Sequence, residues 1–159
     1  MNVNDTQTME FPRFGTCTFN ATDVIRFPWG LPGFPNLHRW LALNVDDQNS
    51  FVWLQSLDDV NVALPTVDPY FIFEEYDPKL PAYATAALEI ENPSDFTILS
   101  VVVVTKDAED MTMNLFAPLV INLRTRTGRQ VVLENSGFSV RQPIPRKSLP
   151  AAPQAEPAS

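Results

Sequence analysis

The chain has 159 residues, 45% of them hydrophobic, which is enough for one domain with a single hydrophobic core. Its formal net charge is −8, and an acidic protein repels a phosphate backbone, so the composition argues against direct nucleic-acid binding. The single cysteine, Cys17, excludes an internal disulfide and fits a reducing compartment.

Short strands separated by turn signals account for the first half of the chain. Residues 1–12 are expected to be frayed. Residues 25–35 carry three prolines and two glycines, which predicts an ordered loop, pinned by Phe27, Trp29 and Phe34. Alternation and turn composition predict strands at residues 14–19, 40–45, 51–56 and 62–67. Pro65 interrupts the last of these and marks an edge or a bulge.

The second half contains the clearest strand and the one predicted helix. Residues 79–88 are alanine-rich and predict a short helix. Residues 96–105 include four consecutive valines, which suit a buried strand. The composition of residues 46–50, 91–95 and 107–110 is typical of turns. From Arg141 the chain is rich in Pro, Ala and Ser, so we expect it to be disordered.

Residues 114–135, NLFAPLVINLRTRTGRQVVLEN, have the pattern of a β-hairpin. Apolar residues alternate over residues 119–123, a polar turn over residues 124–129 carries Gly128, and residues 130–134 return. Two apolar runs around a Gly-bearing loop predict a hairpin, but the pattern is common and carries no chemistry of its own.

These elements predict a mostly β fold. We expect a single domain built as an irregular β-barrel or sandwich of short antiparallel strands with little helix. The chain divides into a flexible N-terminus at residues 1–12, a β domain at residues 13–142, and a Pro- and Ala-rich disordered tail at residues 143–159.

The ends and the apolar runs indicate a cytoplasmic protein that contacts no membrane. Residues 1–10 are polar and acidic and lack the basic start and apolar core of a signal peptide. The longest apolar run, residues 98–104, is too short to span a bilayer.

The sequence offers little material for an active site. The one histidine, His38, has no second histidine with which to bind a metal or relay a proton, so we expect it at the surface. Cys17 lacks an obvious partner base and is expected in an apolar position. Asp58-Asp59 and Glu74-Glu75 are neighbouring carboxylates, which point to opposite faces on a strand and form no acid–base dyad.

Other ligand-binding patterns are also missing from the sequence. The five glycines are scattered and form no phosphate-binding loop. Asp68, Glu74, Glu75 and Asp77 could approach a cation, but they lack the spacing of a calcium loop. We therefore expect no catalytic residue, no metal and no cofactor.

Charge and aromatic residues point instead to a protein partner. Residues 40–113 contain fourteen acidic residues and two basic ones, and such a body attracts a basic protein, although solubility is the commoner role of this charge. Tyr70, Phe71, Phe73 and Tyr76 mix with acidic residues without clean alternation. Exposed aromatics rimmed by charge mark partner surfaces; a small core cluster under a loop is the equally weighted alternative.

Four strings, in order, resemble the pattern of the flagellar assembly factor FliW family. They are FPWGLPGF at residues 27–34, FVWLQSLDD at 51–59, VDPY at 67–70, and NLFAPLVIN at 114–122 followed by QVVLE at 130–134. The resemblance covers about residues 14–143. Val60 departs from the family's usual Pro and Phe138 from its frequent Tyr, and the tail beyond Pro143 matches nothing in the pattern.

The resemblance implies a non-enzymatic protein that binds flagellin and the RNA-binding translational repressor CsrA. When free flagellin is scarce, released FliW holds CsrA off the flagellin message and translation resumes. We expect an acidic body bound to CsrA to lower its affinity for phosphate without occupying the RNA groove, which is an allosteric, non-competitive antagonism. The alternatives are a dedicated flagellin chaperone without a translational role, and a small enzyme.

The predicted partner-binding residues come from two segments. They are Asp68, Phe71 and Glu74 in the acidic-aromatic segment, and Asn114, Leu115, Pro118, Ile121 and Asn122 in the hairpin. A structural role has equal weight for each, for example Asn114 as a turn former and Ile121 as core. Asn122→Arg is expected to separate the two, because a surface residue would keep the melting temperature and lose binding.

Overall fold

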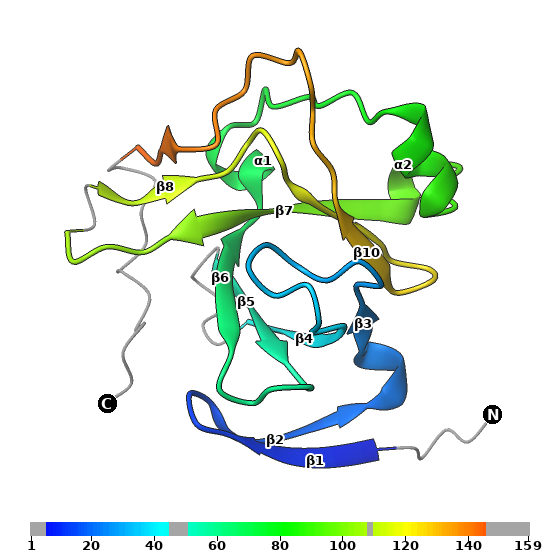
Figure 1. The fold of residues 1–159 in the computed structure, drawn as a ribbon, viewed down its shortest axis with the longest axis vertical. Helices are drawn as coiled ribbons and strands as arrows, with labels where there is room; N and C mark the ends of the chain where they lie inside the picture. Colours follow the sequence, from blue (N-terminus) through cyan, green and yellow to red (C-terminus); the bar gives the residue numbers. More distant parts are fainter. Residues whose placement is uncertain (1–5, 45–50, 108–109, 146–159) are drawn as a thin grey trace.

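The computed structural model describes residues 6–44, 51–107 and 110–145 (Figure 1). Its strands are β1 (Thr6–Phe11), β2 (Gly15–Asn20), β3 (Ile25–Arg26), β4 (Arg39–Leu43), β5 (Phe51–Ser56), β6 (Ala63–Val67), β7 (Phe96–Val103), β8 (Thr112–Met113), β9 (Leu119–Asn122), β10 (Thr127–Gln130) and β11 (Gln142–Pro143). The helices are α1 (Pro69–Ile72) and α2 (Ala82–Ala87), with single 3-10 turns at Ala21–Asp23 and Pro93–Asp95. None of the helices in these described ranges is long and apolar enough to cross a bilayer.

Seven strands close into a barrel, in the order β7, β6, β5, β4, β3, β10 and β9, with β9 returning to β7. The closing ladder runs from Phe96 opposite Asn122 to Leu99 opposite Leu119. The pairings are antiparallel except β3 with β10, which is parallel. The predicted mostly β class is confirmed, and the architecture is a barrel rather than a sandwich.

The remaining strands extend the barrel at two places. β8 pairs with the last two residues of β7, and β11 pairs with β8. β1 and β2 form a separate hairpin that lies across the bottom of the molecule as drawn in Figure 1. The loops and helices between residues 68 and 95 lie at the top, where residues 131–141 pass alongside them.

Three apolar clusters follow from the alternation of side chains along the strands. Leu119 and Ile121 on β9 join a cluster centred on Trp40, Phe27 and Leu54, which come from other barrel elements. Val120, between them, points to the opposite side of the sheet and joins a second cluster under the two helices. A third cluster joins the β1–β2 hairpin to the barrel. Strands β5, β7 and β9 are therefore buried on both faces over part of their length.

The two ends of the described chain are more ordered than the sequence indicates. Residues 6–11, predicted to be frayed, form β1, because pairing with β2 and burial of Phe11 supply the stabilisation that local sequence lacks. Gln142 and Pro143 pair with β8 and Ile144 is buried, so the predicted disorder is wrong for residues 141–145. Residues 1–5 and 146–159 lie outside the described residues.

The hairpin is confirmed, but its turn is misplaced in the prediction. The turn spans residues 123–126, with Arg126 at φ +59°, and β10 already begins at Thr127. Gly128 lies in β10 opposite Ile121, where a Cβ atom would come within 2.5 Å of the Phe27 ring. Close packing, and not a turn, is the reason for glycine there.

The Pro- and Gly-rich loop is anchored by two of its three predicted aromatics. Phe27 is fully buried, and Phe34 packs edge-on against Trp40 with ring centroids 6.4 Å apart. Trp29 is wrongly predicted as an anchor, since 51% of its surface is exposed. Residues 25–26 also pair as β3 instead of belonging to the loop.

Most other predicted elements are confirmed with shifted ends. The short helix falls within residues 79–88 as α2, and strands form at the four predicted places in the first half. Pro65 lies on the part of β6 that pairs only with β5, because the ladder to β7 involves Thr66 and Val67. This agrees with the predicted edge position. The predicted turn at residues 46–50 lies outside the described residues.

Candidate partner-binding surfaces

Helix α1 is a single turn that the local sequence specifies. Asp68 caps it, since the side chain accepts a hydrogen bond of 2.9 Å from the backbone N–H of Tyr70. Pro69 occupies the first helical position, where its missing N–H costs nothing. The helix follows directly after β6, which is hydrogen-bonded to β5 and β7.

The aromatic residues around α1 divide into buried and exposed ones. Tyr76 is buried, donates a hydrogen bond of 2.8 Å from its hydroxyl to the carbonyl of Leu115, and packs against Phe138 with ring centroids 4.9 Å apart. Burial raises the pKa of the Tyr76 phenol well above its usual value. The ring of Tyr70 packs against that of Tyr76, with centroids 5.7 Å apart, and remains partly exposed. Phe71 is 71% exposed.

Four carboxylates belong to the same segment as these two exposed rings: Glu74, Glu75 and Asp77 are exposed, and Asp68 is partly buried. We call Asp68, Tyr70, Phe71, Glu74, Glu75 and Asp77 the acidic-aromatic surface. Burial, and then the charges of Asp77 and Asp68, raise the pKa of Tyr70, so these carboxylates are close enough to act on it. Asp77 is also paired with Lys79 at 3.2 Å, in an exposed position. Tyr76 therefore belongs to the core, whereas Phe71 lies at the surface, and a partner role for Phe71 stays a prediction.

Of the eight predicted contact residues, the five in the hairpin segment have structural roles in the fold. Leu115, Pro118, Ile121 and Asn122 are buried. The Asn114 side chain accepts hydrogen bonds from the N–H groups of Phe116 and Ala117, at 3.1 and 2.8 Å, as a turn former does. Packing occupies the four buried residues and hydrogen bonding occupies Asn114, so their contact with a partner stays a prediction. Asp68, Phe71 and Glu74 remain accessible.

Asn122 is the clearest case of a hairpin residue with a structural role. The side chain is fully buried, and its amide donates a hydrogen bond of 2.6 Å to the carbonyl of Leu88. Its side-chain oxygen accepts from the N–H groups of Arg124 and Thr125 at 2.8 and 3.1 Å. Asn122→Arg would bury a charge and break this network, so it cannot serve as a surface probe.

A second exposed cluster was not predicted from the sequence. The guanidinium carbon of Arg129 lies 4.4 Å from the ring centroid of Trp29 and 5.0 Å from that of Tyr83. Trp29 is 51% exposed and Tyr83 is 50% exposed. The three residues come from the loop after β3, from α2 and from β10, and no local pattern links positions so far apart in the chain.

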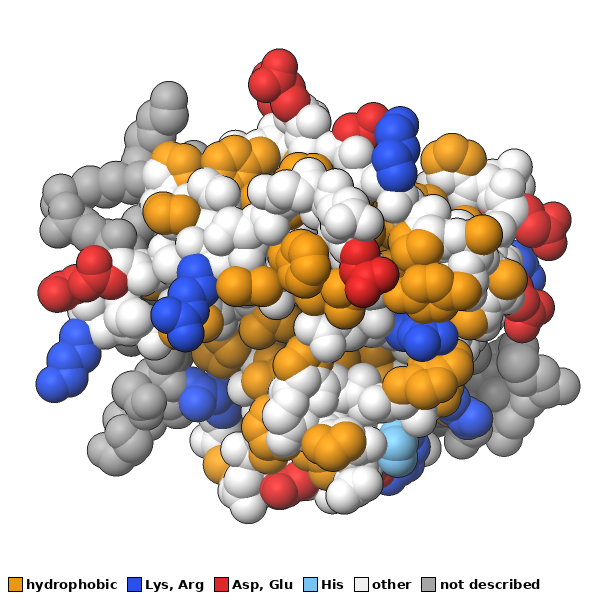
Figure 2. Space-filling model, turned by 45° about the horizontal axis from the view of Figure 1, so that its top comes forward, with side chains coloured by type: hydrophobic (Ala, Val, Ile, Leu, Met, Phe, Trp, Pro, Cys, Tyr) orange, Lys and Arg blue, Asp and Glu red, His pale blue; other side chains and the backbone are white. Residues whose placement is uncertain are grey.

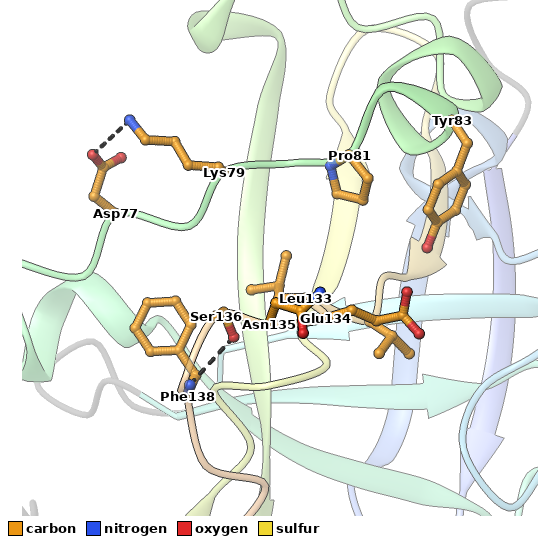
Figure 3. Close-up of a pocket in the computed structure, with 10 residues that line it drawn as sticks. Asp77, Lys79, Pro81, Tyr83, Leu133, Glu134, Asn135, Ser136 and Phe138 are labelled. Carbon is orange, nitrogen blue, oxygen red and sulfur yellow. Dashed lines mark hydrogen bonds and ion pairs between the residues drawn. The ribbon is translucent and has the colours of Figure 1, made fainter.

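A groove of about 490 Å³ lies between the acidic-aromatic surface and this cluster. Its lining residues are Asp77, Lys79, Pro81, Tyr83, Val132, Leu133, Glu134, Asn135, Ser136 and Phe138. Figure 3 shows Tyr83 at one end and Asp77 with Lys79 at the other. On the face shown in Figure 2, hydrophobic side chains gather between scattered acidic and basic groups, as they do at protein interfaces.

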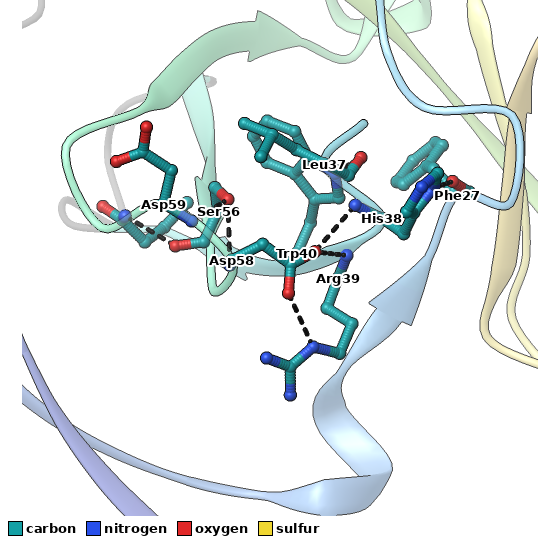
Figure 4. A network of polar contacts seen from close by, with 9 residues as sticks. Phe27, Leu37, His38, Arg39, Trp40, Ser56, Asp58 and Asp59 are labelled. Carbon is teal, nitrogen blue, oxygen red and sulfur yellow. Dashed lines mark hydrogen bonds and ion pairs between the residues drawn. The ribbon is translucent and has the colours of Figure 1, made fainter. Parts of the chain in front are cut away.

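The carboxylate pair at Asp58-Asp59 serves to hold a loop in place (Figure 4). Asp58 accepts hydrogen bonds from the N–H groups of His38 and Arg39 at 2.8 and 3.0 Å, and from the Arg39 side chain at 2.8 Å. Burial opposes ionisation, but these hydrogen bonds outweigh it and hold the pKa of Asp58 below its usual value. His38 is exposed, and a ring nitrogen lies 3.0 Å from the carbonyl oxygen of Phe27.

The remaining candidate groups are dispersed. Cys17 is partly buried and packs against the third apolar cluster, in agreement with the predicted apolar position. Across the described residues, no three His, Cys, Asp or Glu side chains come together as metal ligands do.

Comparison with known proteins gives one consistent similarity. A family model described as FliW protein matches residues 8–144. The flagellar assembly factor FliW of Clostridium tetani is 33% identical over 130 residues, which is 82% of this chain and 90% of the relative. That of Syntrophus aciditrophicus is 36% identical over 132 residues, covering 83% of this chain and 84% of the relative.

The structural comparison agrees. A crystal structure of the flagellar assembly factor FliW matches with a TM-score of 0.79 and 28% sequence identity, over 87% of this chain and 96% of that one. The resemblance drawn from the four sequence strings is confirmed.

Proposed function

The chain belongs to the FliW protein family, and from this premise we propose that it is a non-enzymatic flagellar assembly factor that acts in the cytoplasm by binding proteins. The observation that carries the proposal is the acidic-aromatic surface. Phe71 is 71% exposed on a short, capped helix, in a segment that also carries carboxylates. Apolar side chains in such positions become buried when a partner binds. Phe71 contributes little to the core.

We propose that this surface binds a CsrA-type repressor. A protein that binds RNA through basic residues is attracted to the carboxylates of Asp68, Glu74 and Glu75, which raises the association rate. In the complex, the ring of Phe71 becomes buried and contributes apolar contact area. The other described Phe residues are at least partly buried, so Phe71 is the natural anchor of such a contact.

The antagonism follows from charge rather than from blocking the RNA site. An acidic protein bound beside the RNA site lowers the repressor's affinity for phosphate without occupying the RNA groove. The repressor can bind RNA and this protein at the same time, but each weakens the binding of the other. The penalty is reciprocal, and RNA must weaken binding of this protein by the same factor. Flagellin, as second partner, withdraws the protein from the repressor when free subunits accumulate.

Isothermal titration calorimetry with purified CsrA and purified flagellin, separately and in competition, tests the proposal. The proposed function requires binding to both. Binding to flagellin alone would establish the alternative, a flagellin chaperone without a translational role. Binding to neither would refute both.

A further inference from the structure

The cluster of Trp29, Arg129 and Tyr83 has features of a binding site and contributes little to the hydrophobic core. Arg129 lies over two aromatic rings, each about half exposed, and its side chain is itself partly exposed. Trp, Tyr and Arg are the residue types enriched among the few side chains that dominate protein interfaces. Here all three meet at one place.

Arg129 also has unused hydrogen-bonding capacity. Within the described part of the chain, its guanidinium makes no ion pair or hydrogen bond, and its contacts are with the two rings. Arg39, by comparison, pairs with Asp58 at 2.8 Å. Cation-π contacts leave guanidinium N–H groups available, and the rings hold the planar group in place, so a planar carboxylate could bind it through two parallel hydrogen bonds.

Apolar surface adjoins this cation. Tyr83 belongs both to the cluster and to the groove, and the exposed Val132 lines the same groove together with Pro81, Leu133 and Phe138 (Figure 3). A ligand bound at Arg129 could therefore place a neighbouring apolar side chain in the groove. Recognition of this kind selects a carboxylate and a hydrophobic residue side by side.

The charge at this cluster is opposite to that at the acidic-aromatic surface. Arg129 lies on β10, whereas the partly buried Asp68 precedes α1 and the exposed Glu74 and Glu75 follow it. A basic partner is favoured at α1 and an acidic one at Arg129. The groove between them also carries Asp77 of the acidic-aromatic surface, Lys79 and Glu134, so the selection of a carboxylate rests on Arg129 itself.

We propose that Trp29, Arg129 and Tyr83, with the adjoining groove, form a second docking surface that takes a protein segment with a carboxylate beside an apolar side chain. This surface adds to the function proposed above, and its ligand need not be either partner named there.

The test uses synthetic peptides, so it does not depend on CsrA or flagellin. One peptide carries a single glutamate flanked by leucines, and its twin carries glutamine instead. Binding to the 15N-labelled protein is followed through the indole N–H resonance of Trp29. Trp40 and Trp53 are buried and serve as internal references. Arg129→Gln removes the proposed contact, and Arg141→Gln is the control at an exposed arginine outside the cluster.

The expected result is a shift of the Trp29 resonance by the glutamate peptide, with affinity roughly tenfold above that of the glutamine twin. Arg129→Gln should abolish this preference, while Arg141→Gln and Phe71→Ser keep it. If Arg129→Gln lowers the melting temperature, Arg129→Lys decides, because it keeps the charge and loses the bidentate geometry, so the preference for the glutamate peptide should fall.

Equal responses to the two peptides, no response to either at millimolar concentration, or a preference unaffected by both Arg129 variants overturns the proposal. Equal loss in Phe71→Ser would show that the two surfaces are one.

Discussion

The side-chain amide of Asn122 donates a hydrogen bond of 2.6 Å to the carbonyl oxygen of Leu88, which joins the end of β9 to the residue that follows α2. The side-chain oxygen of Asn122 also accepts two N–H groups of the β9–β10 turn. One buried side chain therefore satisfies a carbonyl 34 residues away in the chain and two N–H groups of its own turn.

Asn122→Ala should destabilise the protein by about 2–4 kcal/mol, because it leaves a buried carbonyl and two turn N–H groups without partners. Urea denaturation measures the change. Asn61→Ala, at an exposed asparagine, is the control and should change stability by less than about 0.5 kcal/mol. Equal effects of the two substitutions would contradict the role given to Asn122.

Phe71→Ser should weaken CsrA binding by roughly tenfold or more and leave the melting temperature unchanged, because the ring is exposed and is proposed to become buried in the complex. Calorimetry and thermal denaturation measure the two quantities. Leu123→Ser removes another exposed apolar side chain, from the β9–β10 turn, and should affect neither. A Phe71→Ser variant with unchanged affinity would remove α1 from the interface.

Salt should weaken the antagonism of CsrA, because the Debye length falls from about 10 Å at 0.1 M to about 3 Å at 1 M salt. A mobility-shift assay of CsrA with flagellin leader RNA, with and without this protein, measures the effect at several salt concentrations. Glu74→Lys should reduce the antagonism at low salt and have little effect at high salt. An antagonism that is the same at every salt concentration would refute the electrostatic mechanism.

Tyr76→Phe should cost about 1–2 kcal/mol near neutral pH, because the buried hydroxyl loses its hydrogen bond with the carbonyl of Leu115. The pKa of Tyr76 is raised in the folded protein, so the stability that it contributes is complete below its unfolded value of 10.0 and is lost as the pH rises above that value. Urea unfolding at about pH 7 and about pH 11 should show a smaller alkaline loss in the variant than in the wild type. Equal alkaline losses would show that Tyr76 does not titrate as its burial implies.

Local patterns in the sequence determine the identity of the strands and the family. Alternation and β-branched runs locate β5 and β7, alanine content locates α2, and the four strings indicate the FliW family without reference to the fold. The capping signal at Asp68-Pro69 is also local and could have predicted α1. These features depend on neighbouring residues, so the sequence contains them directly.

Which side chains reach the surface was decided by the tertiary structure. Alternation places Ile121 and Asn122 on opposite faces of β9, but it does not reveal that closure of the barrel covers one face and the loop after α2 covers the other. Trp29 and Arg129 meet because β3 pairs with β10 across a hundred residues of chain. Pairing between distant strands depends on how the whole chain closes, and no window of sequence contains that information.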